Sequence, residues 1–307
     1  MRRVDAVHLL LMCTAAAFAY LVPFELLLLS YVVLGPAHYL TEISWLHDRK
    51  FFLPHRGIAL VLVAVAVGAA FIENGTVFGV VMWLVFVVCA LFAAATTAAE
   101  GMILVMAAAL LTIALAAGGT NFVILGSLLP TLVHVSLFTL VFMVLGAFRS
   151  GSKAQALLVA VYLMAIVVIL AVPPSAATVV PKFGKIAHEY FGGVAPALGR
   201  ALSISDLTLD ARITGLLAFV YSYHYLNWFI KADVIRWAEI PRARLALVVA
   251  FSAASTGLYF YNYILGFSVL LALSLLHVIL EFPLNSLALR QLGTIVGQRL
   301  AGMAQRA

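Results

Sequence analysis

The chain has 307 residues, of which 65% are hydrophobic and only 10% are charged. Soluble domains carry about 25% charged residues, so this composition excludes an ordinary soluble protein and indicates a polytopic membrane protein. The net charge of +6 does not favour nucleic acid as a partner, because the basic residues stand at the ends of apolar segments, where they orient membrane helices. Cys13 and Cys89 both lie within apolar segments, which excludes a disulfide framework and a C-x-x-C motif.

The first apolar segment, residues 6–22, follows two arginines and admits two interpretations. The small residues around 17–19 are typical of the site at which a signal peptide is cleaved. We favour a retained first membrane span, because a second apolar segment begins almost at once. Cleavage would not change the orientation of the later helices.

Nine further apolar segments follow, separated by Pro, Gly and charged residues. They cover residues 24–46, 58–72, 77–98, 102–117, 122–148, 155–172, 212–231, 245–261 and 266–288. The sequence therefore predicts an all-α fold, a bundle of about ten transmembrane helices in which residues 1–307 form a single integral membrane domain. Two of the segments, 58–72 and 102–117, are short enough to be tilted hairpin partners.

Lys and Arg give the predicted orientation. If the N-terminus is cytoplasmic, fourteen of the eighteen basic residues fall in cytoplasmic segments. The positive-inside rule then places both termini inside, in the cytoplasmic (inner) membrane. The remaining four lie in or beside one long outer loop, residues 173–211: Lys182, Lys185, Arg200 and Arg212.

Four of the eight histidines fall inside predicted spans, each close to the middle of its span: His38, His134, His224 and His277. All four spans run from outside to inside, so the four side chains share one depth in the membrane. Ionisable residues inside a span are costly and usually face the bundle interior, where they have partners. Unrelated core histidines would have no reason to share a depth, so we predict that these four converge on a buried metal site.

Two of these helices also carry a carboxylate four residues after the histidine, Glu42 after His38 and Glu281 after His277. At that spacing both side chains project from one face of a helix. Paired Glu/His helices build buried di-iron and di-manganese sites, although the usual spacing there is Glu-x-x-His. Carboxylate and imidazole together suit iron, as Fe²⁺, or manganese. A single iron held by imidazoles, with the acids orienting them, fits equally well.

Prolines flank the predicted ligands: Pro36 precedes His38, Pro130 precedes His134, and Pro283 follows Glu281. Each proline frees a backbone carbonyl and bends its helix beside the site. Prolines are also common in membrane helices in general. The sequence leaves both interpretations open.

Aromatic and amide side chains surround the predicted ligands, and we expect Tyr39, Tyr225, Asn227 and Trp228 to bind substrate. The alternative is an aromatic belt at the inner membrane interface, because charged residues follow directly after residue 230. For Trp228 the belt is the favoured interpretation. The sequence contains no phosphate-binding loop, no G-x-S-x-G and no dinucleotide fingerprint, which excludes a nucleotide or acyl-enzyme chemistry of those kinds.

Residues 35–42 read G-P-A-H-Y-L-T-E and resemble the G-x-x-H-G-x-x-D stretch of the Brp/Blh family of membrane β-carotene 15,15′-dioxygenases. Members of that family are multi-helix bundles that hold one iron through histidines and cleave a carotenoid to retinal. The resemblance implies that His38 is an iron ligand and that the His224 segment corresponds to the family's later histidine motif. Tyr39 replaces a Gly, Glu42 replaces an Asp, and Trp228 stands where a second histidine of that later motif belongs. The resemblance therefore extends to the class of chemistry and not to the substrate.

The leading hypothesis is an integral-membrane non-haem iron oxygenase or related oxidoreductase. Its substrate would be lipophilic, such as a carotenoid, an isoprenoid or a fatty acyl chain, and would enter from membrane lipid, with an electron donor as a further partner. Glu42 and Glu281 would be ligands, bridges or general bases. Three alternatives stay open: a b-type haem protein with axial histidines, a transporter that uses the same polar layer for protons or metal ions, and a structural role in which satisfied polar groups hold the helices together.

Overall fold

The computed structural model describes residues 3–53, 56–72, 74–94, 98–117, 129–172, 174, 209–237 and 239–304, and all regular structure in those ranges is helical. The predicted all-α class is therefore confirmed. The predicted outer loop, residues 173–211, lies outside the described residues except for Pro174 and the start of the helix that follows it.

The described residues form α-helices, two π-helical turns and one 3-10 turn. In chain order they are α1 (Arg3–Leu21), α2 (Pro23–Leu29), the π-helical turn η1 (Ser30–Leu34), α3 (Gly35–Asp48), the 3-10 turn η2 (Lys50–Phe52), α4 (Arg56–Ala69), α5 (Gly75–Ala94), α6 (Ala98–Ala117), α7 (Leu129–Leu132), the π-helical turn η4 (Val133–Phe138), α8 (Thr139–Ser150), α9 (Lys153–Ala171), α12 (Leu209–Ile230), α13 (Ala232–Ile235), α14 (Arg242–Tyr261) and α15 (Tyr263–Ala304).

Six of the described helical stretches are long and apolar enough to cross a membrane. They are Val4–Leu21, Pro23–Asp48, Val133–Ser150, Lys153–Ala171, Arg242–Tyr261 and Tyr263–Ala301. Three shorter apolar helices, Gly57–Ala69, Gly75–Val87 and Met102–Ala117, accompany them. Several long apolar helices of this kind fit a membrane protein.

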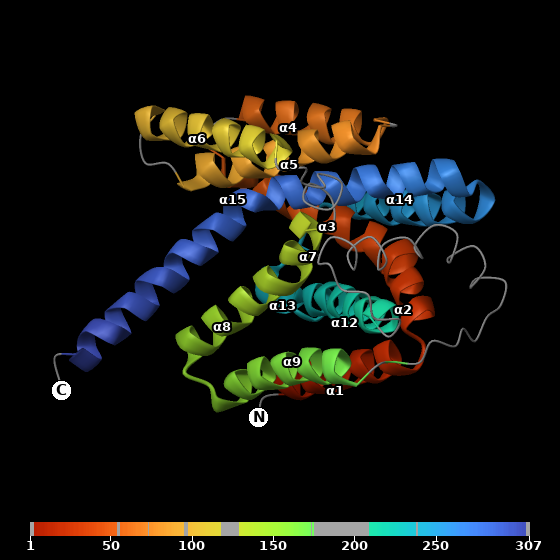
Figure 1. Cartoon of the computed structure of the whole chain (residues 1–307). Coiled ribbons are helices and arrows are strands. Elements are labelled where there is room, and N and C mark those ends of the chain that lie inside the picture. Colours follow the sequence, from red (N-terminus) through yellow and green to blue (C-terminus); the bar gives the residue numbers. More distant parts are fainter. Residues whose placement is uncertain are drawn as a thin grey trace.

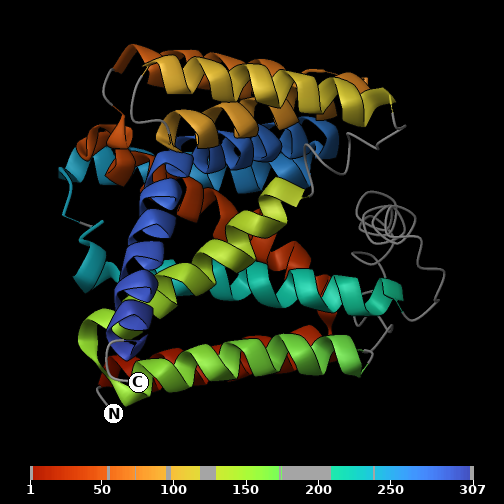
Figure 2. The same cartoon turned by 60° about the vertical axis from the view of Figure 1, so that its left-hand side comes forward.

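The helices stack in layers that both whole-chain views show (Figures 1 and 2). α4, α5 and α6 form one outer layer, which packs on α15. α1 and α9 form the opposite outer layer. The continuous stretch α2–η1–α3, the stretch α7–η4–α8, α12 and the first half of α15 lie between them. The polar middle of the bundle is therefore covered on two sides by apolar helices.

α12 lies in this middle layer and contacts α1, α2 and α9. Its aromatic side chains Phe219 and Tyr223 are completely buried and belong to the largest apolar cluster of the described core. Its polar residues also find partners inside the bundle, since the hydroxyl groups of Ser222 and Ser30 lie 2.6 Å apart. A helix packed on most of its sides in this way can carry several polar residues, because few of them face lipid.

The prolines coincide with irregular helix geometry next to the histidines. The π-helical turn η1 ends directly before Gly35 and Pro36, and η4 contains His134 itself. Pro36 cannot donate to the carbonyl of Val32, and the hydroxyl of Thr256 on α14 donates to that oxygen instead, at 2.8 Å. Pro283 lies inside α15, whose second half runs away from the layer of its first half (Figure 1).

The hairpin between α14 and α15 gives a test of the packing. A Cβ atom added to Gly266 would lie 2.2 Å from the Cα of Tyr259 on α14, whereas one added to Gly257 would meet nothing within 4 Å. We expect Gly266→Ala to lower the free energy of unfolding by about 1–3 kcal/mol, because the two backbones must move apart. Gly257→Ala, in the interior of α14, should be neutral or stabilising. Thermal unfolding of both variants in detergent measures the difference, and equal midpoints would contradict this account of the hairpin.

Candidate metal centre

Four separate helical elements bring the four histidines together. His38 comes from α3, His134 from η4, His224 from α12 and His277 from α15. One ring nitrogen of each lies within 4.8 Å of one ring nitrogen of every other. The predicted convergence is thus confirmed.

The four imidazoles pack edge to face in a closed ring. The centroid of His38 lies 4.8 Å from that of His224 and 5.3 Å from that of His277, and the centroid of His134 lies 4.9 Å and 5.0 Å from the same two rings. His38, His134 and His277 are at most 2% exposed. His224 borders the cavity described below.

The Nε2 atom of His38 has two polar neighbours that one proton cannot satisfy. It lies 3.1 Å from Nε2 of His224 and 3.0 Å from Oε2 of Glu42. A ring nitrogen of a neutral imidazole offers either one N–H or one lone pair, so Nε2 of His38 cannot form well-directed hydrogen bonds to both neighbours at once. Two nitrogens bound to one metal ion at roughly 2.1 Å lie about 3.0–3.4 Å apart, a range that includes the observed separation.

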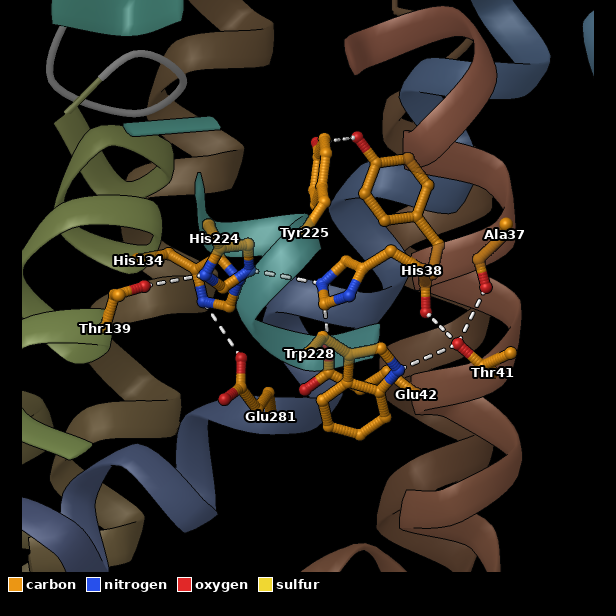
Figure 3. Close-up of polar contacts among 11 residues, drawn as sticks. Ala37, His38, Thr41, Glu42, His134, Thr139, His224, Tyr225, Trp228 and Glu281 are labelled. Atoms are coloured by element: carbon orange, nitrogen blue, oxygen red, sulfur yellow. Dashed lines mark hydrogen bonds and ion pairs between the residues drawn. The ribbon is translucent and has the colours of Figure 1, made fainter. Parts of the chain in front are cut away.

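The two acids lie beside the histidines, and both are buried, with 2% and 5% exposure for Glu42 and Glu281. Glu42 contacts the histidine of its own helix, as its spacing predicts. Glu281 instead contacts a histidine of another element, since its Oε2 lies 3.0 Å from Nδ1 of His134 (Figure 3). The two carboxyl groups also interact with each other. Both acids therefore belong to the same polar cluster as the four histidines.

Several buried polar atoms of the cluster have no hydrogen bond among the described residues. In this part of the chain Nε2 of His134 and Nε2 of His277 have no polar partner, whereas Nδ1 of His134, Oε2 of Glu42 and Oε2 of Glu281 have only the ion-pair contacts described above. Leaving a buried donor or acceptor unsatisfied costs about 1–3 kcal/mol for each group. A cation at the centre of the cluster would satisfy several of them together, so the donor set fits a metal ion.

Hydrogen bonds and ring contacts hold the histidines from behind. The hydroxyl of Thr139 lies 2.8 Å from Nδ1 of His224. The Tyr39 ring stacks on that of His277, with centroids 4.2 Å apart, and its hydroxyl lies 2.6 Å from that of Tyr225. Contacts of this kind fix the orientation and tautomer of a ligating imidazole. The structure thus places Tyr39 and Tyr225 against the cluster.

The favoured interpretation of Trp228 as a membrane-interface residue is wrong. Its side chain is 8% exposed and packs against His38, with ring centroids 5.5 Å apart. Its Nε1 donates to the hydroxyl of Thr41 at 2.9 Å, and Thr41 in turn donates to backbone carbonyls of its own helix. The side chain turns inward because α12 lies in the middle layer, so that the face bearing Trp228 meets α3.

Two polar residues of the site were not predicted. Asn285 is completely buried, and its position four residues after Glu281 places it on the same face of α15 as His277 and Glu281. This spacing was a signal available in the sequence. Thr139 carried no such signal, because it follows His134 across a π-helical turn, where ordinary helical spacing does not apply.

A cavity of about 480 Å³ reaches the cluster from one side. At the cluster it is bordered by His38, His224, the two acids, Asn227 and Trp228, and among the described residues Tyr39 and Tyr225 do not contribute to its lining. Asn227 and Trp228 are therefore placed to contact a bound molecule. Tyr39 and Tyr225 lie behind the histidines and support them.

The chain matches no protein-family model, no curated protein and no solved structure.

The contact between Thr139 and His224 can be tested by stability. Thr139→Val keeps the side-chain shape but removes the buried hydroxyl, so Nδ1 of His224 loses its partner. We expect the free energy of unfolding to fall by about 1–3 kcal/mol. Thr294→Val, which removes an exposed hydroxyl on α15, is the matched control and should change stability little. Denaturation of both variants in the same detergent provides the comparison, and similar losses would argue against the contact.

Proposed function

We propose that this protein is an integral-membrane, non-haem iron oxygenase or related oxidoreductase that acts on a lipophilic substrate. The observation that carries the proposal is the meeting of four imidazoles from four helical elements, with nitrogens within 4.8 Å of one another and two carboxylates in contact with them. The resemblance of residues 35–42 to the Brp/Blh dioxygenases points to the same class of chemistry. His38, His134, His224 and His277 would hold the metal.

The donor set favours iron, with manganese as the second choice. Imidazole nitrogen with carboxylate oxygen is typical of non-haem iron sites, and cysteine sulfur takes no part in the cluster among the described residues. One ion held by four histidines and two ions bridged by the acids are both compatible with these donors. Such an iron centre, when bound, supplies the capacity to activate O₂.

The protein's own residues would position the substrate and move protons. Glu42 and Glu281 lie at the inner end of the cavity, where either carboxylate can bind the metal or accept a proton from the substrate. Asn227 presents a buried amide oxygen without a partner toward the same space. The surrounding apolar side chains would exclude water from the reacting atoms.

The membrane arrangement belongs to the same proposal. Ten spans, with both termini in the cytoplasm, would place the protein in the inner membrane as one domain, and the cluster near the middle of the bilayer. A lipophilic substrate would then reach the site from membrane lipid. Reduction of the iron would require an electron donor as a partner.

The haem protein and the transporter have less support. In a haem protein, axial histidines stand on opposite faces of a macrocycle, whereas these four rings contact one another directly. A transporter of the familiar kinds would show internal repeats, and the sequence has none that we detect.

Metal analysis tests the proposal. We expect the purified protein to contain iron, and His38→Ala and His277→Ala each to lose most of it while still inserting into the membrane, because each removes one of the converging imidazoles. His47→Ala changes an exposed histidine at the end of α3 and should keep its metal. Mass spectrometry of the metal content and a visible spectrum give the readout. Full metal content in both site variants, or a Soret band, would overturn the proposal.

The metal should also stabilise the fold. A ligand that binds only the native state at a hundred times its dissociation constant adds about 2.7 kcal/mol of stability. We therefore expect chelation to lower the unfolding midpoint and added Fe²⁺ to restore it. In His277→Ala the midpoint should respond to neither treatment. If neither chelator nor added Fe²⁺ changes the unfolding midpoint of the wild-type protein, the protein does not hold iron at this site.

A further inference from the structure

A lysine in the cavity wall takes no part in the metal cluster. Lys231 follows the last turn of α12, is partly buried and lines the cavity. It is close enough to His224 at the cluster and to His8 on α1 to influence both electrostatically. The ion pairs formed among the described residues do not include it. A partly buried ammonium group that forms no ion pair with a described acid is unfavourable by itself, so this position is suited to an anion.

A second cation stands farther out along the same cavity. Arg149, in the last turn of α8, is exposed and donates to the side-chain oxygen of Gln291 on α15. That hydrogen bond fixes the guanidinium at the outer end and leaves other N–H groups available. Asp5 is the acid that also lines this end, and it has interactions of its own. Lys231 and Arg149 therefore outnumber the acid at the outer end.

The cavity between these cations and the histidines is apolar. Phe142 and Met143 of α8 line it together with Leu284 and Leu287 of α15. On α8, ten residues separate Thr139 from Arg149, which corresponds to about 15 Å along the helix axis. On α12, seven residues separate His224 from Lys231, which corresponds to about 10 Å. The lining is thus cationic at one end, apolar in the middle and rich in metal-binding groups at the other end.

We propose that the cavity binds an amphiphile whose anionic head group, a carboxylate or a phosphate, pairs with Lys231 and Arg149. Its apolar chain extends along α8 and α15 to the histidines. The inference rests on the proposed function, which it deepens by naming the substrate class. The fixed distance from the cations to the metal centre then determines which part of the chain reacts.

Binding of four probes to the full chain in neutral-lipid nanodiscs tests the inference. The probes form two pairs that differ in head-group charge, hexadecanoate with hexadecan-1-ol and farnesyl diphosphate with farnesol. At least one anionic probe should bind about tenfold or more tightly than its alcohol, and Lys231→Gln should remove most of that preference. The pair that shows the preference identifies the head group as carboxylate or phosphate.

Two further variants make the result interpretable. Lys153→Gln removes the same charge at the same end of the molecule, from a side chain outside the cavity, and should leave the preference intact. Arg149→Gln changes an exposed position and should weaken binding of the anionic probe. This variant keeps the test valid even if Lys231→Gln fails to fold. Equal binding of charged and neutral probes would overturn the inference. So would equal effects of the Lys153 and Lys231 variants, or no effect of the Arg149 variant.

Metal analysis of the same samples separates this inference from the proposed function. Charge-selective binding by a protein that holds no metal, either as purified or after addition of Fe²⁺, would support the head-group site and reject the oxygenase. Iron binding without charge selectivity would support the metal centre and reject the head-group site.

Discussion

The cost of burying ionisable groups is the constraint on which the middle of this bundle depends. His38, His134 and His277 are almost completely buried, and Glu42 and Glu281 are nearly so. Each group by itself would be expensive in an apolar environment, and a partial network would leave charges or lone pairs uncompensated. The groups therefore gather at one place, where a cation can satisfy several of them together. Two layers of apolar helices flank that place.

The irregular helix segments follow from the same constraint. A regular α-helix repeats its faces every 3.6 residues, and this limits where its side chains can point. The π-helical turn η4 carries His134, and its wider turn lets Thr139, five residues later, reach His224 on α12. The turn η1 precedes Pro36, and the carbonyl that the proline leaves free is satisfied from α14. In this way the helices bend beside the site without leaving a buried carbonyl of Val32 unpaired.

The sequence alone predicted those features that depend on residue type and on the spacing of residues along helices. Composition indicated a helical membrane protein, and the shared depth of His38, His134, His224 and His277 predicted that they meet. Contacts between side chains of different helices could not be predicted from the sequence and became visible only in the structure. The pairing of Glu281 with His134 depends on how α15 packs against η4, and the inward orientation of Trp228 depends on the central place of α12. Hydropathy gives the burial of a whole helix only roughly, so it cannot tell an inward aromatic residue from one at the interface.

The layers also explain why the site is approached from one side. α4, α5 and α6 cover α15 on the side away from the cavity, and cavity-lining residues come from α1, α3, α8, α9, α12, α13 and α15. The two outer layers thus differ. The layer of α4, α5 and α6 covers the site on one side, and the layer of α1 and α9 borders the cavity that leads to it. Since α15 carries His277 and Glu281 in its first half and Gln291 after Pro283, one helix extends from the cluster to the cationic end of the cavity. α15 changes direction along its length (Figure 1) and contains Pro283, which removes one backbone hydrogen bond and so permits a helix to bend.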